Sequence, residues 1–294
     1  MAIKIGNSPE SWGIYGPSNQ DQISWERCLD EISSAGYQWL ELGPYGYLPT
    51  NPVNLRKELR QRGLNIIAGG ILAPLENESL WSNMQKEVLK TGELLASVDA
   101  KFLLVIDDFY RYQTGQELAP NKLDNRSWAK LIETLHKLAN LVRNQFNLQL
   151  AFHPCADTHV QYENQINTLI MDTNPDWVTL CLDTGHHAYR FGDPVSFMKK
   201  HHSRIGYLHL KGVDPKIREQ VNKKDTAFMD AVKLGVMCEP ALGAIDFTMF
   251  AKVLHEIGYD GYATVEQDMY RPDPNVPLQI ASRTRKYLNQ IGIG

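Results

Sequence analysis

The sequence contains few cysteines, and no two of them have the spacing of a redox or zinc motif. Cys28, Cys155, Cys181 and Cys238 are scattered over 294 residues, and none belongs to a CxxC pair. This usage is typical of a reducing compartment. The first residues lack the basic and apolar regions of a signal peptide. No apolar run approaches the roughly 20 residues that cross a bilayer. We therefore expect a cytoplasmic protein without a membrane partner.

An excess of positive charge is also lacking. The formal net charge is −4 and the calculated pI is near 6.1, so bulk charge does not attract the chain to nucleic acid. With no Lys/Arg stripe, we expect no nucleic-acid partner, and a nuclease acting on abasic DNA is disfavoured. Neither GxGxxG nor GxxxxGK[ST] is present, which argues against a doubly wound nucleotide-binding sheet.

What the sequence does contain is an alternation of short apolar runs with segments of helical period. The eight apolar runs lie at residues 3–6, 39–42, 65–68, 102–106, 149–152, 178–182, 205–210 and 262–265. Nearly continuous apolar character is typical of parallel strands covered on both faces. Helical periodicity follows over residues 23–34, 80–98, 127–143 and 247–257. Gly36, Gly63 and Gly258 stand where helix ends need left-handed residues. This pattern predicts an α/β fold, a single-domain (β/α)8 TIM barrel over residues 1–294.

Two of the loops are long, at residues 107–126 and 212–244. Each follows a predicted strand, so each should lie over the C-terminal mouth, where barrel active sites are found. The second loop is charged, and we expect a short helix within it. The loops could close a pocket or build a dimer interface, so a homo-oligomer stays open.

Four consecutive predicted strands end in a polar residue: His153, Asp183, His209 and Glu266. Imidazole and carboxylate groups are costly to bury unless they are paired or bound to metal. Any one of them alone is more often a hydrogen-bonded core residue, but a barrel would bring all four to one point. Two imidazoles and two carboxylates suit Mn²⁺, Co²⁺, Zn²⁺, Fe²⁺ or Mg²⁺. We predict one divalent metal ion as cofactor.

Other residues near strand ends have two interpretations each. Glu41 either pairs with a neighbouring strand-end cation or binds substrate. Trp12, Tyr45 and Tyr47 either pack the loops or face a sugar, and we favour the sugar. Cys155 is either a soft ligand or a bystander.

The remaining polar strand-end and helix-end residues have structural interpretations. Asp107 and Asp108 are expected to cap their loop or the following helix. His187 is expected at the surface, because successive residues point apart from one another. His201 and His202 are expected in a solvated basic cluster.

Motifs over nearly the whole chain resemble the xylose isomerase-like TIM barrel superfamily of sugar isomerases and epimerases, and within it the inosose dehydratase group. The matching segments are SPESWG (8–13), ELGPYGYLP (41–49), AGG (68–70), LCLDTGHHAY (180–189), GDP (192–194), LHLKGV (208–213) and GYDGYATVEQD (258–268). The resemblance implies that Asp183, His209 and Glu266 ligate the metal. It also implies that His186 handles substrate beside the metal.

The chain departs from the superfamily pattern after its fifth predicted strand. In the isomerases and epimerases a glutamate ends that strand as fourth ligand, whereas His153 stands here, as in dehydratase-like members. Two-base epimerisation is disfavoured without that glutamate. Dehydratase-like members continue His-Pro-His, then Gly-Thr, then Glu. Here Cys155, Asp157 and Gln161 replace the second His, the Gly and the Glu.

These residues predict an enzyme that removes the proton α to a carbonyl of a small polyhydroxylated ketone, with loss of water as the favoured outcome. Glu266 is the candidate base, and Lys211 is an alternative base or a stabiliser of the enediolate. His186 is the expected proton donor, because an imidazole pKa lies near neutrality. The expected substrate-binding residues are Glu41, Trp12, Tyr45, Gln161 and Asp268. The alternatives are a keto-sugar isomerase or epimerase and a non-catalytic sugar-binding barrel.

Overall fold

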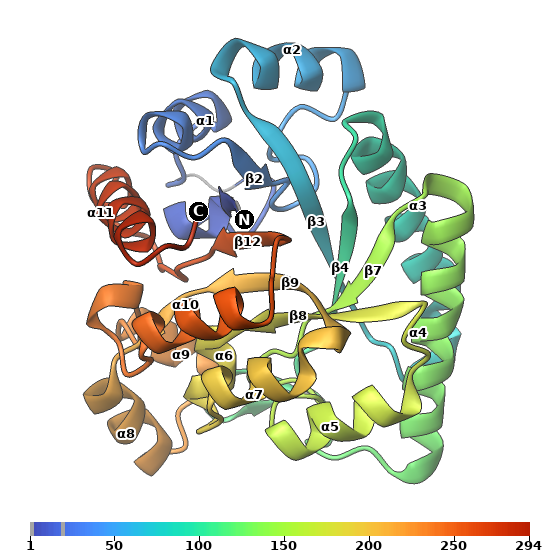
Figure 1. The fold of residues 1–294 in the computed structure, drawn as a ribbon. Helices are drawn as coiled ribbons and strands as arrows, with labels where there is room; N and C mark the ends of the chain where they lie inside the picture. The colour runs from blue at the N-terminus through green and yellow to red at the C-terminus, as the bar shows by residue number, and fades with distance from the viewer. Residues whose placement is uncertain (1–2, 19–20) are drawn as a thin grey trace.

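A closed barrel of eight parallel strands forms the centre of the computed structural model, which describes residues 3–18 and 21–294 (Figure 1). The strands follow one another around the barrel in the order β1, β12, β9, β8, β7, β4, β3, β2. Their bounds are β1 (Lys4–Asn7), β2 (Trp39–Glu41), β3 (Asn65–Ala73), β4 (Phe102–Asp107), β7 (Gln149–Phe152), β8 (Val178–Asp183), β9 (Ile205–Leu210) and β12 (Tyr262–Val265). Each overlaps a predicted run, and the predicted TIM barrel is confirmed. The largest difference is β3, which continues to Ala73 because it stays paired with β4 as far as Asp107.

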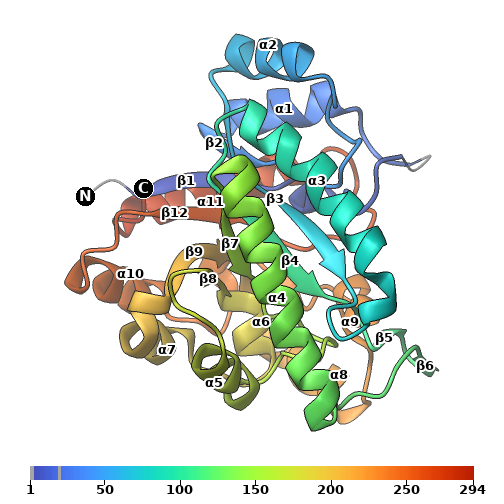
Figure 2. The same ribbon diagram turned by 90° about the vertical axis from the view of Figure 1, so that its right-hand side faces the viewer.

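Helices surround the barrel and cover the outer face of its sheet (Figures 1 and 2). They are α1 (Trp25–Ser34), α2 (Pro52–Arg62), α3 (Trp81–Ser97), α4 (Asn125–Phe146), α5 (Glu163–Asp172), α6 (Thr184–Tyr189), α7 (Pro194–His201), α10 (Phe247–Glu256) and α11 (Pro277–Gln290). Polar side chains accept backbone N–H groups at several helix starts, such as Ser24 at α1 and Asn51 at α2. Gly36, Gly63 and Gly258 have positive φ angles, as predicted. No described helix is long and apolar enough to cross a membrane.

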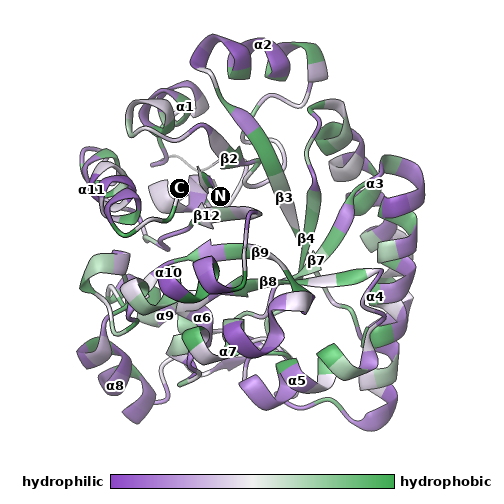
Figure 3. Cartoon of the chain, in the orientation of Figure 1, coloured by the Kyte–Doolittle hydropathy of each residue, from purple (hydrophilic) through white to green (hydrophobic). Residues whose placement is uncertain are grey.

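The apolar side chains form two layers on either side of the barrel wall. The larger layer lies between strands and helices, and Figure 3 shows purple hydrophilic residues on the outward faces of the helices. The smaller layer fills the barrel interior and consists of Ile67, Ala68, Leu104, Ala151, Cys181 and Tyr207. The polar strand ends therefore stand on an apolar floor.

The two long segments contain secondary structure and bind each other. Residues 107–126 contain a hairpin of β5 (Arg111–Gln113) and β6 (Gln116–Glu117). Residues 212–244 contain two helices rather than the expected one, α8 (Pro215–Lys223) and α9 (Phe228–Lys233), and the two-stranded pair β10 (Gly212–Val213) and β11 (Met237–Cys238). Short 3-10 turns complete the described chain: η1 (Pro9–Trp12), η2 (Glu78–Leu80), η3 (His202–Arg204) and η4 (Pro240–Leu242).

Contacts between charged and backbone groups join these two segments. Arg111 Nη1 lies 2.9 Å from Asp225 Oδ1. The backbone N–H of Thr114 donates to Asp230 Oδ2 at 2.7 Å. Because α9 also supplies Phe228, whose ring centroid lies 4.6 Å from that of His186, the second segment reaches the strand-end residues.

Candidate active site

Four strand-end side chains converge at the barrel mouth: His153, Asp183, His209 and Glu266. One donor atom from each lies within 4.8 Å of the others. His153 Nε2 is 3.2 Å from Asp183 Oδ2, and His209 Nδ1 is 3.1 Å from Glu266 Oε2. These side chains lie close together because β8 and β9 pair in a register that places Asp183 directly beside His209. We call these four side chains the strand-end cluster.

The strand-end cluster fits a divalent metal ion. Within residues 3–18 and 21–294, the buried Nδ1 atoms of His153 and His209 have no hydrogen-bond partner. Buried polar atoms are normally satisfied. Nε2 of His153 and Nδ1 of His209 lie beside the carboxylates, 3.2 Å from Asp183 Oδ2 and 3.1 Å from Glu266 Oε2, so the four groups form a ready ligand set. Both histidines and Asp183 are 2% exposed, whereas the Glu266 side chain is 13% exposed. Glu266 is therefore the most accessible member.

Lys211 lies fully buried among three carboxylates. Its Nζ is 3.0 Å from Asp183 Oδ2, 2.7 Å from Glu266 Oε2 and 2.8 Å from Asp268 Oδ2. Burial alone would lower the pKa of Lys211, but Asp183, Asp268 and Glu266 raise it well above its ordinary value. The side chain is therefore a charged ammonium. Of the two predicted roles for Lys211, this favours stabiliser over base.

The ammonium also keeps the neighbouring acids ionised. Burial alone would raise the pKa of Asp183, but the charge of Lys211 brings it well below its ordinary value. Burial likewise opposes ionisation of Glu266, but His209 and Lys211 lower its pKa below the ordinary value. Both carboxylates are thus available as anionic ligands near neutral pH.

Residues 183–185, with the sequence DTG, leave room for Lys211 and hold its backbone in place. A Cβ atom at Gly185 would overlap Cγ of Lys211, so only glycine leaves room for the lysine stem. Thr184 Oγ1 accepts the N–H of Lys211 at 3.1 Å and so joins the ends of β8 and β9. Asp183 has a divided role, since its Oδ1 accepts the N–H of His186 at the start of α6 while Oδ2 faces the strand-end cluster.

Glu41 takes the first of its two predicted roles, pairing with a strand-end histidine. Its Oε1 lies 2.7 Å from His209 Nε2 and accepts the hydroxyl of Tyr207 at 2.8 Å. The Tyr207 hydroxyl in turn lies 2.6 Å from Thr264 Oγ1. Glu41 is only 4% exposed, and its contact with the strand-end cluster is the one with His209.

His186 lies beside His153, with ring centroids 5.4 Å apart. Its Nδ1 accepts the backbone N–H of Ala156 at 3.1 Å, so the ring proton is on Nε2. Burial lowers the pKa of His186 well below its ordinary value. The expectation of a pKa near neutrality is therefore wrong, and the neutral ring is a hydrogen-bond donor. Cys155 Sγ packs against this ring at 3.6 Å and does not join the strand-end cluster.

The prediction that His187 lies at the surface is wrong. The residue is 4% exposed, its Nε2 lies 3.3 Å from Glu163 Oε2, and its ring packs on Phe197. Because α6 starts directly at the end of β8, one of its faces meets the barrel mouth and another meets α7. His202 is exposed as expected, whereas the ring of His201 packs on Phe197.

The predicted sugar-facing aromatic residues are mostly packing residues. Trp12 is 3% exposed and donates from Nε1 to Glu31 Oε2 at 2.7 Å, although part of its surface lines a cavity. Tyr45 lies under Lys90 of α3, with Nζ 4.7 Å from the ring centroid. Tyr47 is 5% exposed and donates its hydroxyl to a backbone carbonyl. Neither tyrosine reaches the strand-end cluster.

Gln161 lies inside the loop that follows β7. Its Oε1 accepts the N–H of Asp157 at 3.0 Å, and its Nε2 donates to the Tyr110 hydroxyl at 3.2 Å. The side chain is 5% exposed. The structure therefore places Gln161 as a loop-ordering residue outside the strand-end cluster.

Asp107 forms a buried ion pair that the sequence did not indicate. Asp108 caps its loop as predicted, by accepting the N–H of Phe109. Asp107 instead lies 2.7 Å from Nδ1 of His159, whose Nε2 lies 3.1 Å from the Pro120 carbonyl. Both ring nitrogens thus face acceptors, as in an imidazolium.

A cavity of about 350 Å³ opens beside the site, and Tyr15 connects the two. The Tyr15 hydroxyl lies 3.4 Å from Asp268 Oδ1.

Glu10 is a further carboxyl near Glu266. Burial and the charge of Glu266 raise the pKa of Glu10 to about 8, although the Ser8 hydroxyl donates to it. Sequence reasoning missed Tyr15 and Glu10, and the SPESWG segment was the one available signal for Glu10.

A family model and curated relatives match nearly the whole chain. The family model is described as xylose isomerase-like TIM barrel and matches residues 29–289. The chain is 30% identical to "Inosose dehydratase 2" of a Bacillus cereus strain, over 98% of this chain and 97% of that protein. It is 29% identical to "Inosose dehydratase" of Clostridium perfringens (strain 13 / Type A), with the same coverage.

Solved structures show the same fold at low sequence identity. The IolI protein with a bound zinc atom has a TM-score of 0.74 and 15% identity, and 98% of each chain is covered. The probable 3-DHS dehydratase AsbF from Bacillus anthracis has a TM-score of 0.73 and 13% identity, with 98% of this chain and 99% of that chain covered.

Proposed function

Because the chain belongs to the xylose isomerase-like TIM barrel family, we propose that it is a divalent-metal-dependent dehydratase acting on a small polyhydroxylated ketone of the inosose type. The predicted family is confirmed, as is the prediction of an enzyme of the dehydratase or isomerase kind. The observation that carries the proposal is the strand-end cluster, whose four donor atoms lie within 4.8 Å of one another.

The strand-end cluster would hold the ion through His153, Asp183, His209 and Glu266, with Mn²⁺, Co²⁺, Zn²⁺, Fe²⁺ and Mg²⁺ as candidates. A divalent ion held there would supply Lewis-acid polarisation of the substrate carbonyl. The apolar layer beneath these groups, together with Phe228 packed on the neighbouring His186, would limit the access of bulk water. Exclusion of water strengthens each electrostatic contact in the site.

Glu266 is the proposed base. Its Oε2 is engaged by Lys211 and His209, whereas Oε1 accepts no hydrogen bond from any described residue. The lowered pKa of Glu266 keeps it ionised, and it is the most accessible member of the strand-end cluster. Oε1 can therefore take the proton from the carbon α to the carbonyl.

Lys211 is the proposed stabiliser of the oxyanion that forms when this proton leaves. Its ammonium is already held in place by Asp183 and Asp268 at 3.0 and 2.8 Å. A preorganised positive charge beside a developing oxyanion is an effective form of transition-state stabilisation. Asp268 thus acts by positioning Lys211.

His186 orients the departing hydroxyl by donating from Nε2. A neutral imidazole does not easily give up this proton, so the proton that completes the leaving water comes from protonated Glu266. The substrate then loses one hydrogen and one hydroxyl, and the base returns to its carboxylate form. With His153 in place of a second glutamate, no opposing carboxylate of the strand-end cluster can return a proton to the other face, which favours dehydration over two-base epimerisation.

The test is a product analysis with defined metal content. Protein stripped by chelator is reloaded separately with each candidate ion and incubated with inososes and keto sugars, and products are identified by mass. Loss of one water supports the proposal, whereas an isomer of unchanged mass would indicate an isomerase or epimerase. Binding without turnover would indicate a sugar-binding barrel.

Matched variants connect that activity to the strand-end cluster. Asp183→Asn is expected to lose both bound metal and turnover. Asp193→Asn is the control, since Asp193 caps α7 by accepting the N–H of Val195. Equal activity in wild type and Asp183→Asn would contradict the proposed site.

A further inference from the structure

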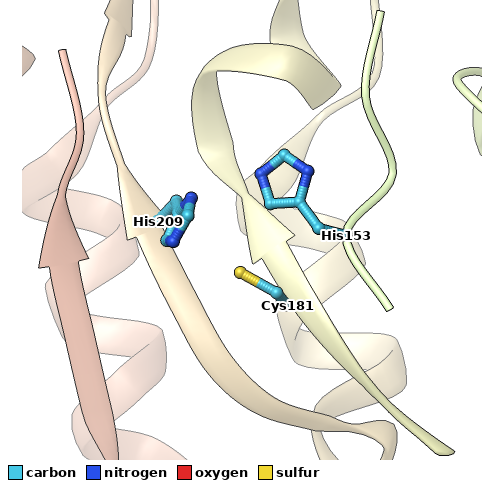
Figure 4. Close-up of side chains that lie close together, drawn as sticks. All are labelled: His153, Cys181 and His209. Carbon is cyan, nitrogen blue, oxygen red and sulfur yellow. The ribbon is translucent and has the colours of Figure 1, made fainter. Parts of the chain in front are cut away.

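A cysteine thiol lies beside the two histidines of the strand-end cluster. Sγ of Cys181 and one ring nitrogen each of His153 and His209 lie within 4.8 Å of one another. Figure 4 shows the thiol of Cys181 projecting from β8 toward His209, with the His153 ring nearby. Cys181 is 0% exposed and each histidine is 2% exposed.

This thiol belongs to a deeper layer of the barrel than the carboxylates. Cys181 precedes Asp183 by two residues on β8, so both side chains point to the same face, separated by about 7 Å along the strand. Cys181 is in register with Tyr207, whereas Asp183 is in register with His209. The histidines therefore have carboxylates on one side and a thiol on the other.

The two sets of donor atoms suit different ions. Carboxylate oxygens with imidazole nitrogens suit Mn²⁺ or Mg²⁺ as well as Zn²⁺, whereas thiolate selects softer ions. We propose that Cys181, His153 and His209 form a second metal position, one layer below the strand-end cluster, that takes a thiophilic divalent ion such as Zn²⁺ or Cd²⁺. This inference rests on the proposed function only in that both positions share the same two histidines.

Occupation of the deeper position has two chemical consequences. The Cys181 thiol must lose its proton when the metal–sulfur bond forms, and that proton passes to solvent. In addition, the two histidines are withdrawn from the upper position. A thiophilic ion should therefore inhibit an enzyme loaded with a harder ion, and it should do so through Cys181.

Cys155 provides a matched control within the same region. It is also buried, at 5% exposed, and its Sγ lies 3.6 Å from His186. Among the described residues, Cys155 belongs to no group of three or more donor atoms that could hold a metal. The two cysteines therefore differ in ligand geometry, although both are buried thiols near the barrel mouth.

The experiment is a Cd²⁺ titration of metal-free protein, followed by ultraviolet absorption and proton release in dilute buffer. Wild type and Cys155→Ser should develop a thiolate-to-cadmium charge-transfer band and release the thiol proton. Cys181→Ser should lose the band and that proton. Glu266→Gln should keep the band while losing Mn²⁺ affinity, because Glu266 belongs only to the upper position.

The outcomes separate this inference from the proposed function. Two results would overturn the deeper position and leave the upper one intact. In one, wild type binds Cd²⁺ without the charge-transfer band. In the other, the band is lost in Cys155→Ser instead of Cys181→Ser. Binding of neither Mn²⁺ nor Cd²⁺ would overturn both. If Cys181→Ser does not fold, X-ray absorption of cadmium-loaded wild type provides the test. One sulfur atom bound to cadmium would support the inference, and the absence of any bound sulfur would refute it.

Discussion

Oε1 of Glu41 lies 2.7 Å from Nε2 of His209, so a carboxylate at the end of β2 holds a histidine at the end of β9 across the barrel. This contact leaves Nδ1 of His209 facing Glu266 at 3.1 Å and Asp183 at 3.5 Å. Metal-binding histidines are commonly oriented by a carboxylate on their second nitrogen. We therefore propose that Glu41 positions His209 within the strand-end cluster.

Replacing Glu41 by glutamine should weaken metal binding without removing a ligand. Loss of such a carboxylate typically lowers metal affinity by about 10–100-fold, and we expect that range for Mn²⁺ in competition with a fluorescent chelator. Glu163→Gln is the control, because Glu163 contacts His187 instead of a member of the strand-end cluster. Equal Mn²⁺ affinities in wild type and Glu41→Gln would refute the positioning role.

Replacing Glu266 by glutamine should abolish most of the turnover even when metal is bound. Loss of a general base lowers kcat by roughly 10²–10⁴-fold. Because Glu266 is also a proposed ligand, kcat is measured at saturating metal, with occupancy determined on the same sample. Full turnover by a metal-loaded variant would assign the proton transfer to another group, and Glu10 would then be the next residue to replace.

Replacing Gly185 by alanine should destabilise the protein by displacing Lys211. The added Cβ would overlap Cγ of Lys211, and overpacking of this kind costs about 1–3 kcal/mol in free energy of unfolding. Urea unfolding measures the change. Gly70→Ala is the control, since its Cβ would meet Leu104 at an ordinary 3.9 Å. An unchanged midpoint for Gly185→Ala would contradict the observed path of the lysine.

The ion pair of Asp107 and His159 should make stability depend on pH. Burial alone would lower the pKa of His159, but Asp107 and the charge of Glu76 raise it above its ordinary value. The folded state then binds the proton more tightly than the unfolded state. The ion pair therefore contributes its full stabilisation below the pKa of His159 in the unfolded chain, about 6.5. This contribution is lost as the pH rises through the pKa of His159 in the folded protein.

The measurement compares wild type with His159→Gln by urea unfolding at several pH values. The difference in free energy of unfolding should be largest below about pH 6.5 and should shrink at higher pH. His255→Gln, at an exposed position of α10, serves as control. A difference that is constant or grows with pH would show that His159 is not held as an imidazolium.

The barrel and the polar residues at its mouth could be predicted from the order of residues along the chain. Strands buried on both faces must be nearly continuously apolar, and for that reason the predicted run at residues 149–152 coincides with β7. A polar residue at the end of such a run is costly unless it has a partner. His153 and Asp183 therefore stood out before any contact was known.

Which of these polar groups contact one another depends on how distant segments pack in the folded chain. Glu41 and His209 are 168 residues apart, and their pairing depends on closure of the barrel. The charge of Lys211 follows from one carboxylate at the end of β8 and two in the segment after β12, and the burial of His187 follows from the docking of α7. Cys181 lies near His209 because β8 pairs with β9 in this register. Such contacts leave no local pattern in the sequence, because they arise between segments that only the folded chain brings together.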